Sequence, residues 1–114
     1  MAQIVRVIAG DTYASGDIVV TLTANGAAYD LTGAQAVSWK TRHIQSTTVA
    51  TSSAVVQGAA TLGKVSPVYT ATESGALTLG RHKVQIEVTT ASGAKRTFPS
   101  PDQPDLWMDV TEGL

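Results

Sequence analysis

Apolar and polar side chains alternate with a period of two along most of the chain, and the helical period of 3.6 is nearly absent. The clearest run is residues 34–42, in which Val37, Trp39 and Thr41 alternate with smaller or charged side chains. Successive side chains of a strand point to opposite faces of its sheet. This run therefore predicts a strand with Trp39 in the core.

The same alternation predicts strands along the rest of the chain. Asn25-Gly26 lies between two of them and is the strongest short hairpin signal, because both residues tolerate a positive φ. Pro67 cannot donate to a ladder, which favours an edge strand or a bulge around it. One helical turn is expected within residues 72–79. The other expected strands are residues 3–9, 17–23, 27–31, 65–70, 80–90, 95–98 and 106–111, with two weakly patterned ones in 44–57.

Short strands with turn signals about every 8–12 residues are typical of an antiparallel β-sandwich. We therefore expect an all-β protein, an antiparallel β-sandwich of about seven to nine strands. No repeat and no linker divides the 114 residues. We expect residues 1–114 to form a single domain.

The amino-acid composition argues against several classes of protein function. The formal net charge is −1, with 8 basic and 9 acidic residues, so the chain lacks the basic footprint of a nucleic-acid binder. A hydrophobic fraction of 43% argues against disorder, and no apolar run is long enough to span a bilayer. The absence of cysteine excludes disulfides and thiol chemistry. No secretory signal is visible at the N-terminus, so we expect synthesis and folding in the cytosol.

Catalytic and metal-binding patterns are not found in the sequence. His43 and His82 have no ligand spacing around them, and we interpret both as surface histidines at strand ends. Asp11, Asp17 and Asp30 could converge on Ca²⁺, but turn capping is the favoured interpretation because no dense ligand run is present. We expect no enzyme activity, no catalytic residue, no metal and no cofactor.

Four cations lie close together in the predicted hairpin of the two strands 80–90 and 95–98: Arg81, Lys83, Lys95 and Arg96. They could form a basic patch for an acidic partner or a phosphate. Interspersed Glu87 favours the simpler interpretation of a solvated face.

Trp107 is the most informative candidate for an interface. Leu106, Met108 and Val110 occupy the core face of the last strand, so alternation turns Trp107 and Asp109 outward. Tryptophan is enriched at interface hot spots. The alternative is that a loop, such as residues 99–104, covers this strand.

The first strand carries apolar side chains on both faces. Ile4 and Ile8 flank Arg6 on the face opposite Val5 and Val7. Such a strand is buried on both faces or meets a neighbour. Together with the low charged fraction of 15%, this pattern favours a surface that lies against other subunits, with Ile4, Ile8, Trp107 and Asp109 as interface candidates.

The order of motifs resembles a known family. Gly10-Asp11-Thr12 follows the first strand, Asp30-Leu31-Thr32-Gly33-Ala34 precedes the tryptophan strand, and Thr97-Phe98-Pro99 ends a glycine-led hairpin. This set resembles the immunoglobulin-like domains of tailed-bacteriophage virion proteins. It is similar in particular to the N-terminal domain of phage baseplate upper proteins.

The resemblance implies an immunoglobulin-like sandwich and a non-enzymatic structural role in the virion, after synthesis in the host cytoplasm. It implies other virion structural proteins as partners, with self-association or attachment to a lattice, and neither nucleic acid nor membrane. Tail or baseplate is slightly favoured, and capsid decoration is the alternative.

A carbohydrate-binding adhesion module is the alternative from another class. Such modules stack sugars on exposed aromatic rings. Only Trp107, together with Tyr13 or Tyr29, could serve that purpose here.

Overall fold

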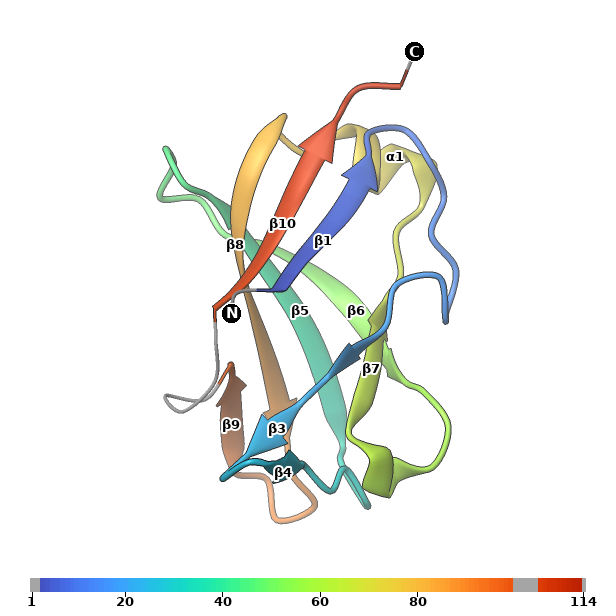
Figure 1. Ribbon diagram of the computed structural model, residues 1–114, viewed down its shortest axis with the longest axis vertical. Coiled ribbons are helices and arrows are strands. Elements are labelled where there is room, and N and C mark those ends of the chain that lie inside the picture. The colour runs from blue at the N-terminus through green and yellow to red at the C-terminus, as the bar shows by residue number, and fades with distance from the viewer. Residues whose placement is uncertain (1–2, 100–104, 114) are drawn as a thin grey trace.

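The chain folds as a β-rich structure with one short helix (Figure 1), described in the computed structural model for residues 3–99 and 105–113. The helical elements are the 3₁₀ turn η1 (Ala60–Leu62) and α1 (Ala71–Gly75). The strands are β1 (Gln3–Ile8), β2 (Val20–Thr21), β3 (Thr23–Ala24), β4 (Ala27–Ala28), β5 (Ala36–His43), β6 (Ala50–Val56), β7 (Lys64–Pro67), β8 (Gly80–Thr89), β9 (Lys95–Phe98) and β10 (Leu106–Thr111).

Eight strands form one curled sheet in the order β1-β10-β8-β5-β6-β7-β2, with β9 added to β8. The pair β3–β4 forms a separate two-stranded ribbon. The expected all-β class is confirmed, but the sheet is mixed rather than wholly antiparallel, because β1 and β10 run parallel. Parallel neighbours need a long connection, and these two strands lie at opposite ends of the chain.

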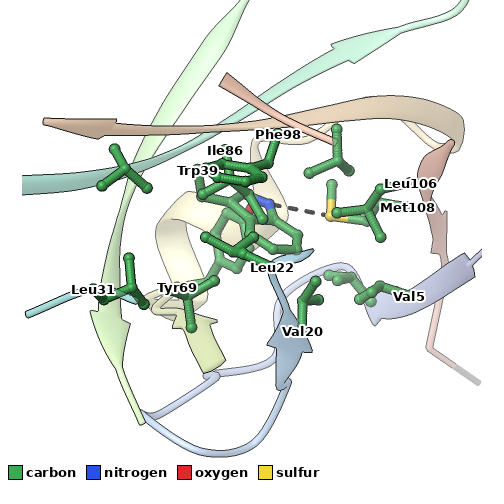
Figure 2. Packing of buried hydrophobic residues seen from close by; sticks show 14 of the residues in the cluster. Val5, Val20, Leu22, Leu31, Trp39, Tyr69, Ile86, Phe98, Leu106 and Met108 are labelled. Carbon is green, nitrogen blue, oxygen red and sulfur yellow. Dashed lines mark hydrogen bonds between the residues drawn. The ribbon is translucent and has the colours of Figure 1, made fainter. Parts of the chain in front are cut away.

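The core fills the inside of the curl (Figure 2). Trp39 of β5 is fully buried, and Ile86 of β8 and Met108 of β10 are buried with it. The Tyr69 hydroxyl donates to the Met108 sulfur at 3.8 Å, and burial raises the pKa of this hydroxyl. The other buried apolar residues are Val5, Val7, Val20, Leu22, Leu31, Val65, Val84, Val88, Phe98, Leu106 and Val110.

The expected alternation is confirmed in the central strands. In β5, Trp39 and Thr41 are buried, whereas Lys40 and Arg42 lie on the other face. In β10, Leu106, Met108 and Val110 are buried, and Trp107 and Asp109 face outward and are half-buried. The sequence pattern therefore assigns the two faces of these strands correctly.

The expected hairpin at Asn25-Gly26 is also confirmed. Asn25 and Gly26 have φ of 55° and 79°, and they connect Ala24 of β3 directly to Ala27 of β4. Two consecutive positive φ values are the geometry of a type I′ turn.

The expected helical turn is α1, and the sequence explains where it begins. The Thr70 hydroxyl accepts from the Glu73 N–H, and the Glu73 carboxylate accepts from the Thr70 N–H. This reciprocal capping box satisfies two N–H groups at the start of the helix. Ser74 donates to the Asp11 carbonyl at 2.6 Å and accepts from the Gly10 N–H at 3.0 Å, which ties the loop after β1 to the helix.

Two strand expectations were wrong. Residues 44–57 contain one strand, β6, rather than two. The expected strand 17–23 is divided between β2, which joins the large sheet, and β3, which joins the ribbon.

The expectation of an edge around Pro67 fits the structure, because β2 pairs only with Lys64 and Val65 and leaves Pro67 without a described partner strand on that side. Pro67 is the last residue of β7, and the next N–H, that of Val68, donates to the Ser53 carbonyl at 3.1 Å. Ladder groups alternate in direction, so the position of the missing Pro67 donor faces away from β6, and the pairing with β6 is complete.

Close packing around Gly63 generates the first prediction. A Cβ at Gly63 would lie 2.8 Å from the Leu22 carbonyl oxygen and 2.9 Å from that of Tyr29, whereas one at Gly26 would meet nothing within 4 Å. Both glycines have positive φ, so alanine carries about 1–2 kcal/mol of backbone strain at either position. Gly63→Ala adds the backbone collision and should lower the free energy of unfolding by about 3 kcal/mol or more. Urea denaturation of the two variants measures this, and equal losses would contradict the packing described.

Candidate interaction surface

The outer face is the side of β1, β10, β8 and β5 that points away from the core. Strand register places one continuous row of side chains across it. Ile4 lies opposite Trp107, Trp107 opposite Lys83, and Lys83 opposite Arg42. Neighbouring strands are about 4.8 Å apart, so the row is roughly 14 Å long. It runs from apolar side chains at the sheet edge to cations over the centre.

The apolar part consists of three of the predicted interface residues. Ile4 and Ile8 are 43% and 40% exposed, and Trp107 is half-buried. The Arg81 guanidinium lies 5.9 Å from the centre of the Trp107 ring. The proposed cover of residues 99–104 lies outside the described residues except for Pro99. Within the described chain, the outer face of β1 thus exposes apolar surface to solvent.

The fourth predicted residue, Asp109, has a different role. Its carboxylate accepts two hydrogen bonds from Arg81, at 2.8 and 3.0 Å. These bonds and the nearby charges of Arg81 and Arg6 lower the pKa of Asp109, and the same pair raises the pKa of Arg81. The pair therefore holds Arg81 over the Trp107 ring.

The backbone of β1 is an open sheet edge. Gln3 and Ala9 donate to the carbonyls of Asp105 and Thr111, which flank or end β10. Ladder groups alternate in direction, so those of Ile4 and Arg6 point away from β10. Tyr13 and Asp11 occupy the edge only at Ile8, whose N–H donates to the Tyr13 hydroxyl and whose carbonyl accepts from Asp11. Among the described residues, nothing pairs with the edge at Ile4 and Arg6.

A groove lies on the outer face beside Lys83. Its volume is about 530 Å³, and the residues that line it include Lys40, Arg42, Val49, Thr51, Lys83 and Gln85. At its margin Glu87 contacts Lys40 at 3.2 Å and Lys95 at 3.5 Å. The hydrogen bond from Lys40 is the main cause that lowers the pKa of Glu87.

The four cations that sequence reasoning grouped do not form one patch. Arg81 pairs with Asp109, and Lys95 pairs with Glu87. Arg96 lies on the other face, 5.4 Å from the centre of the Tyr29 ring.

Only Lys83 of that group lines the groove, where Lys40 and Arg42 join it. Sequence reasoning missed this second set of cations. The alternation in residues 34–42 did turn Lys40 and Arg42 outward. The pairing of β5 with β8, which brings them beside Lys83, is not visible in either segment alone.

The interpretation of both histidines as surface groups was wrong for His82, which is only 4% exposed. Its ring meets that of His43 edge to face at 5.2 Å. His82 donates from Nε2 to the Thr78 carbonyl at 2.7 Å, and His43 donates to that of Leu79 at 3.1 Å. His82 shares the alternation of Val84 and Ile86, which was the available signal for burial. Through these two hydrogen bonds the histidines anchor Thr78 and Leu79, the two residues before β8.

Two of the three aspartates that could have converged on Ca²⁺, Asp17 and Asp30, accept hydrogen bonds from nearby residues. Asp30 accepts from the N–H and the hydroxyl of Thr32, which lowers its pKa, and Asp17 accepts from the Ala14 N–H. Within residues 3–99 and 105–113, no three histidine, aspartate or glutamate side chains gather as metal ligands. None of the helices in those ranges is long and apolar enough to cross a membrane.

The two tyrosines considered as sugar-stacking partners lie away from Trp107. The Tyr13 hydroxyl bonds to Ile8, at the opposite end of β1 from the Ile4–Trp107 pair. The Tyr29 ring packs against Phe98 at 4.9 Å, beside the core. No described aromatic ring joins Trp107 on the outer face.

The chemical groups on the outer face are suited to binding another molecule. It combines exposed apolar side chains, an open backbone edge and a groove with cations, all on one side of the same sheet. No model of a protein family, no curated protein and no solved structure matches this chain.

The Arg81–Asp109 pair generates the second prediction. Folding lowers the pKa of Asp109, so the pair stabilises the fold at pH values above 3.8, the pKa of this group in the unfolded chain. This stabilisation is lost as the pH falls through the lower pKa of Asp109 in the folded protein. Asp109→Asn should therefore be less stable than the natural chain at neutral pH, by a small amount because the pair is exposed. The difference should vanish at low pH.

Urea midpoints measured between neutral pH and roughly pH 2.5 test this. Glu112→Gln removes an exposed acid that makes no ion pair to a described residue, and it is the matched control. A stability difference for Asp109→Asn that is unchanged at the lowest pH would contradict the assignment.

Proposed function

We propose that this chain is a non-enzymatic structural module of a tailed-phage particle that docks on other virion subunits through its outer face. The observation that carries the proposal is the exposed apolar edge. Ile4 and Trp107 lie opposite each other on β1 and β10, and Ile8 continues the surface along β1. The motif order that resembles phage virion domains supplies the biological setting.

Topology supports the immunoglobulin-like assignment within this proposal. In such folds three strands, C, F and G, form one sheet, with a buried tryptophan on strand C, and strands B and E pair in the other sheet. Here β5, β8 and β10 are adjacent, Trp39 of β5 is fully buried, and β2 pairs with β7. The β6 strand joins the two groups into one curled sheet, which differs from a simple sandwich.

Physical chemistry supports docking at this face. Burial of apolar surface is favourable by about 25 cal/mol per Å², and large exposed apolar side chains that adjoin one another gain from a partner. A tryptophan held by a packed cation presents a rigid ring, so it loses little freedom on binding. The open edge at Ile4 and Arg6 can add backbone hydrogen bonds to an approaching strand.

Within the particle, the tail or baseplate is the favoured location, because the motif order is most similar to baseplate proteins. Capsid decoration is the second location. Separation of purified particles into heads and tails, followed by quantitative mass spectrometry, distinguishes them. Enrichment with the tail fraction supports the first location, and enrichment with heads supports the second.

The third prediction concerns the particle itself. If the chain is a structural component, it should co-purify with intact particles in a fixed ratio to the major structural proteins and should resist washing with salt. Quantitative mass spectrometry of density-purified particles measures this ratio. Its absence from particles, while the chain is abundant in infected cells, would overturn the proposal.

The fourth prediction concerns the docking face. Trp107→Ala should weaken incorporation into particles by about 2 kcal/mol or more, roughly 30-fold in affinity, because a hot-spot ring is removed. Leu62→Ala is the matched control, since Leu62 is an exposed apolar residue of η1 outside the outer face. Competition between tagged variants during assembly measures both. Equal incorporation of the two variants would contradict docking through Trp107.

A further inference from the structure

The groove on the outer face has cations in a regular arrangement. Lys40 and Arg42 are two residues apart on β5 and point the same way, so their Cα atoms are about 7 Å apart. Lys83 of β8 lies directly opposite Arg42, at a Cβ separation of about 5 Å. The three cations form an L-shaped set fixed to the two central strands of the sheet. The spacing of their Cα atoms is therefore set by strand geometry rather than by loop conformation.

Two of these cations have no anionic partner among the described residues. Arg42 donates from one terminal nitrogen to the Ser46 carbonyl at 2.9 Å, which holds its guanidinium in place and leaves its other donors available. Lys83 makes no ion pair with a described carboxylate. Lys40 shares its charge with Glu87. The groove thus offers one anchored guanidinium and one unpaired ammonium to a ligand.

The outer face as a whole is basic although the chain is not. On β1, β5, β8 and β10 this face carries the cations Arg6, Lys40, Arg42, Arg81 and Lys83 and the acids Glu87 and Asp109. The formal net charge of the whole chain is −1. The outer face therefore carries more cations than acids, and it is the face that also carries Trp107.

Charge complementarity requires an anionic occupant. Strand spacing restricts its form, because carboxylates at alternate positions of an extended chain are also about 7 Å apart and point the same way. The groove volume of about 530 Å³ suits a short segment. Val49 lines one side of the groove, and Trp107 lies next to Lys83 on the other, so apolar groups flank the cations.

A polypeptide fits these features better than a nucleic acid. Affinity for nucleic acid depends on the number of phosphates neutralised, and this groove offers only a few cations on a chain whose net charge is −1. A phosphate backbone also gains nothing from the apolar groups beside the cations. An acidic segment of protein can satisfy the cations with its carboxylates and the flanks with its aliphatic groups.

We propose that the groove between Lys40, Arg42 and Lys83 binds an extended acidic segment of a partner protein that carries carboxylates at alternate positions. This inference rests on the proposed function, which it deepens by specifying the chemistry of the docked subunit. The apolar edge supplies contact area, and the groove selects the partner and its register.

Binding of labelled peptides to the intact protein tests the inference, with fluorescence anisotropy as the readout. The first peptide carries three glutamates at alternate positions among threonines and serines, and the second has the same composition with the glutamates consecutive. The first should bind at least about 5-fold more tightly. Arg42→Gln and Lys83→Gln should each weaken it about 5-fold, whereas Lys64→Gln, an exposed cation of β7, should leave it unchanged.

Three results would overturn the inference. The peptides could bind equally or not at all; the groove variants could match Lys64→Gln; or a single-stranded oligonucleotide could bind more tightly than either peptide through Arg42 and Lys83. Incorporation into particles distinguishes a failure of this inference from a failure of the proposed function. If Trp107→Ala lowers incorporation and the two groove variants do not, docking stands and the acidic partner segment is wrong.

Discussion

The period-two alternation of the three central strands is the constraint on which the rest of the structure depends. Trp39, Ile86 and Met108 point into the curl from β5, β8 and β10. A slip of one residue would exchange the two faces of a strand, so burial on one side fixes the register of all three. The same register determines what lies outside. Arg42, Lys83 and Trp107 form a row because the residues beside them are needed in the core.

The amino-acid pattern predicted most of this local structure. It assigned the two faces of β5 and β10, the turn at Asn25-Gly26 and the helical turn before β8, because each depends on neighbours in sequence. It also turned Trp107 outward. What it could not predict were pairings between distant segments, such as the parallel contact of β1 with β10. Those depend on how the sheet curls, which no single segment encodes.

The same limit applies to the candidate surface. Ile4 and Trp107 were each selected from their own strand, and the fold alone shows that they are neighbours. The groove was missed, because Lys40, Arg42 and Lys83 meet only when β5 pairs with β8. The burial of His82 was missed for another reason. The absence of metal-ligand spacing outweighed the alternation it shares with Val84.

The central claim is that the outer face meets a partner, and lysine footprinting tests it most directly. Lys83 lies on this face and Lys64 lies on β7, away from it. Acetylation of the free protein and of purified particles, read by mass spectrometry, compares the two amines under the same conditions. The account predicts that Lys83 becomes protected in particles while Lys64 remains reactive. Protection of Lys64 with Lys83 unchanged would contradict it.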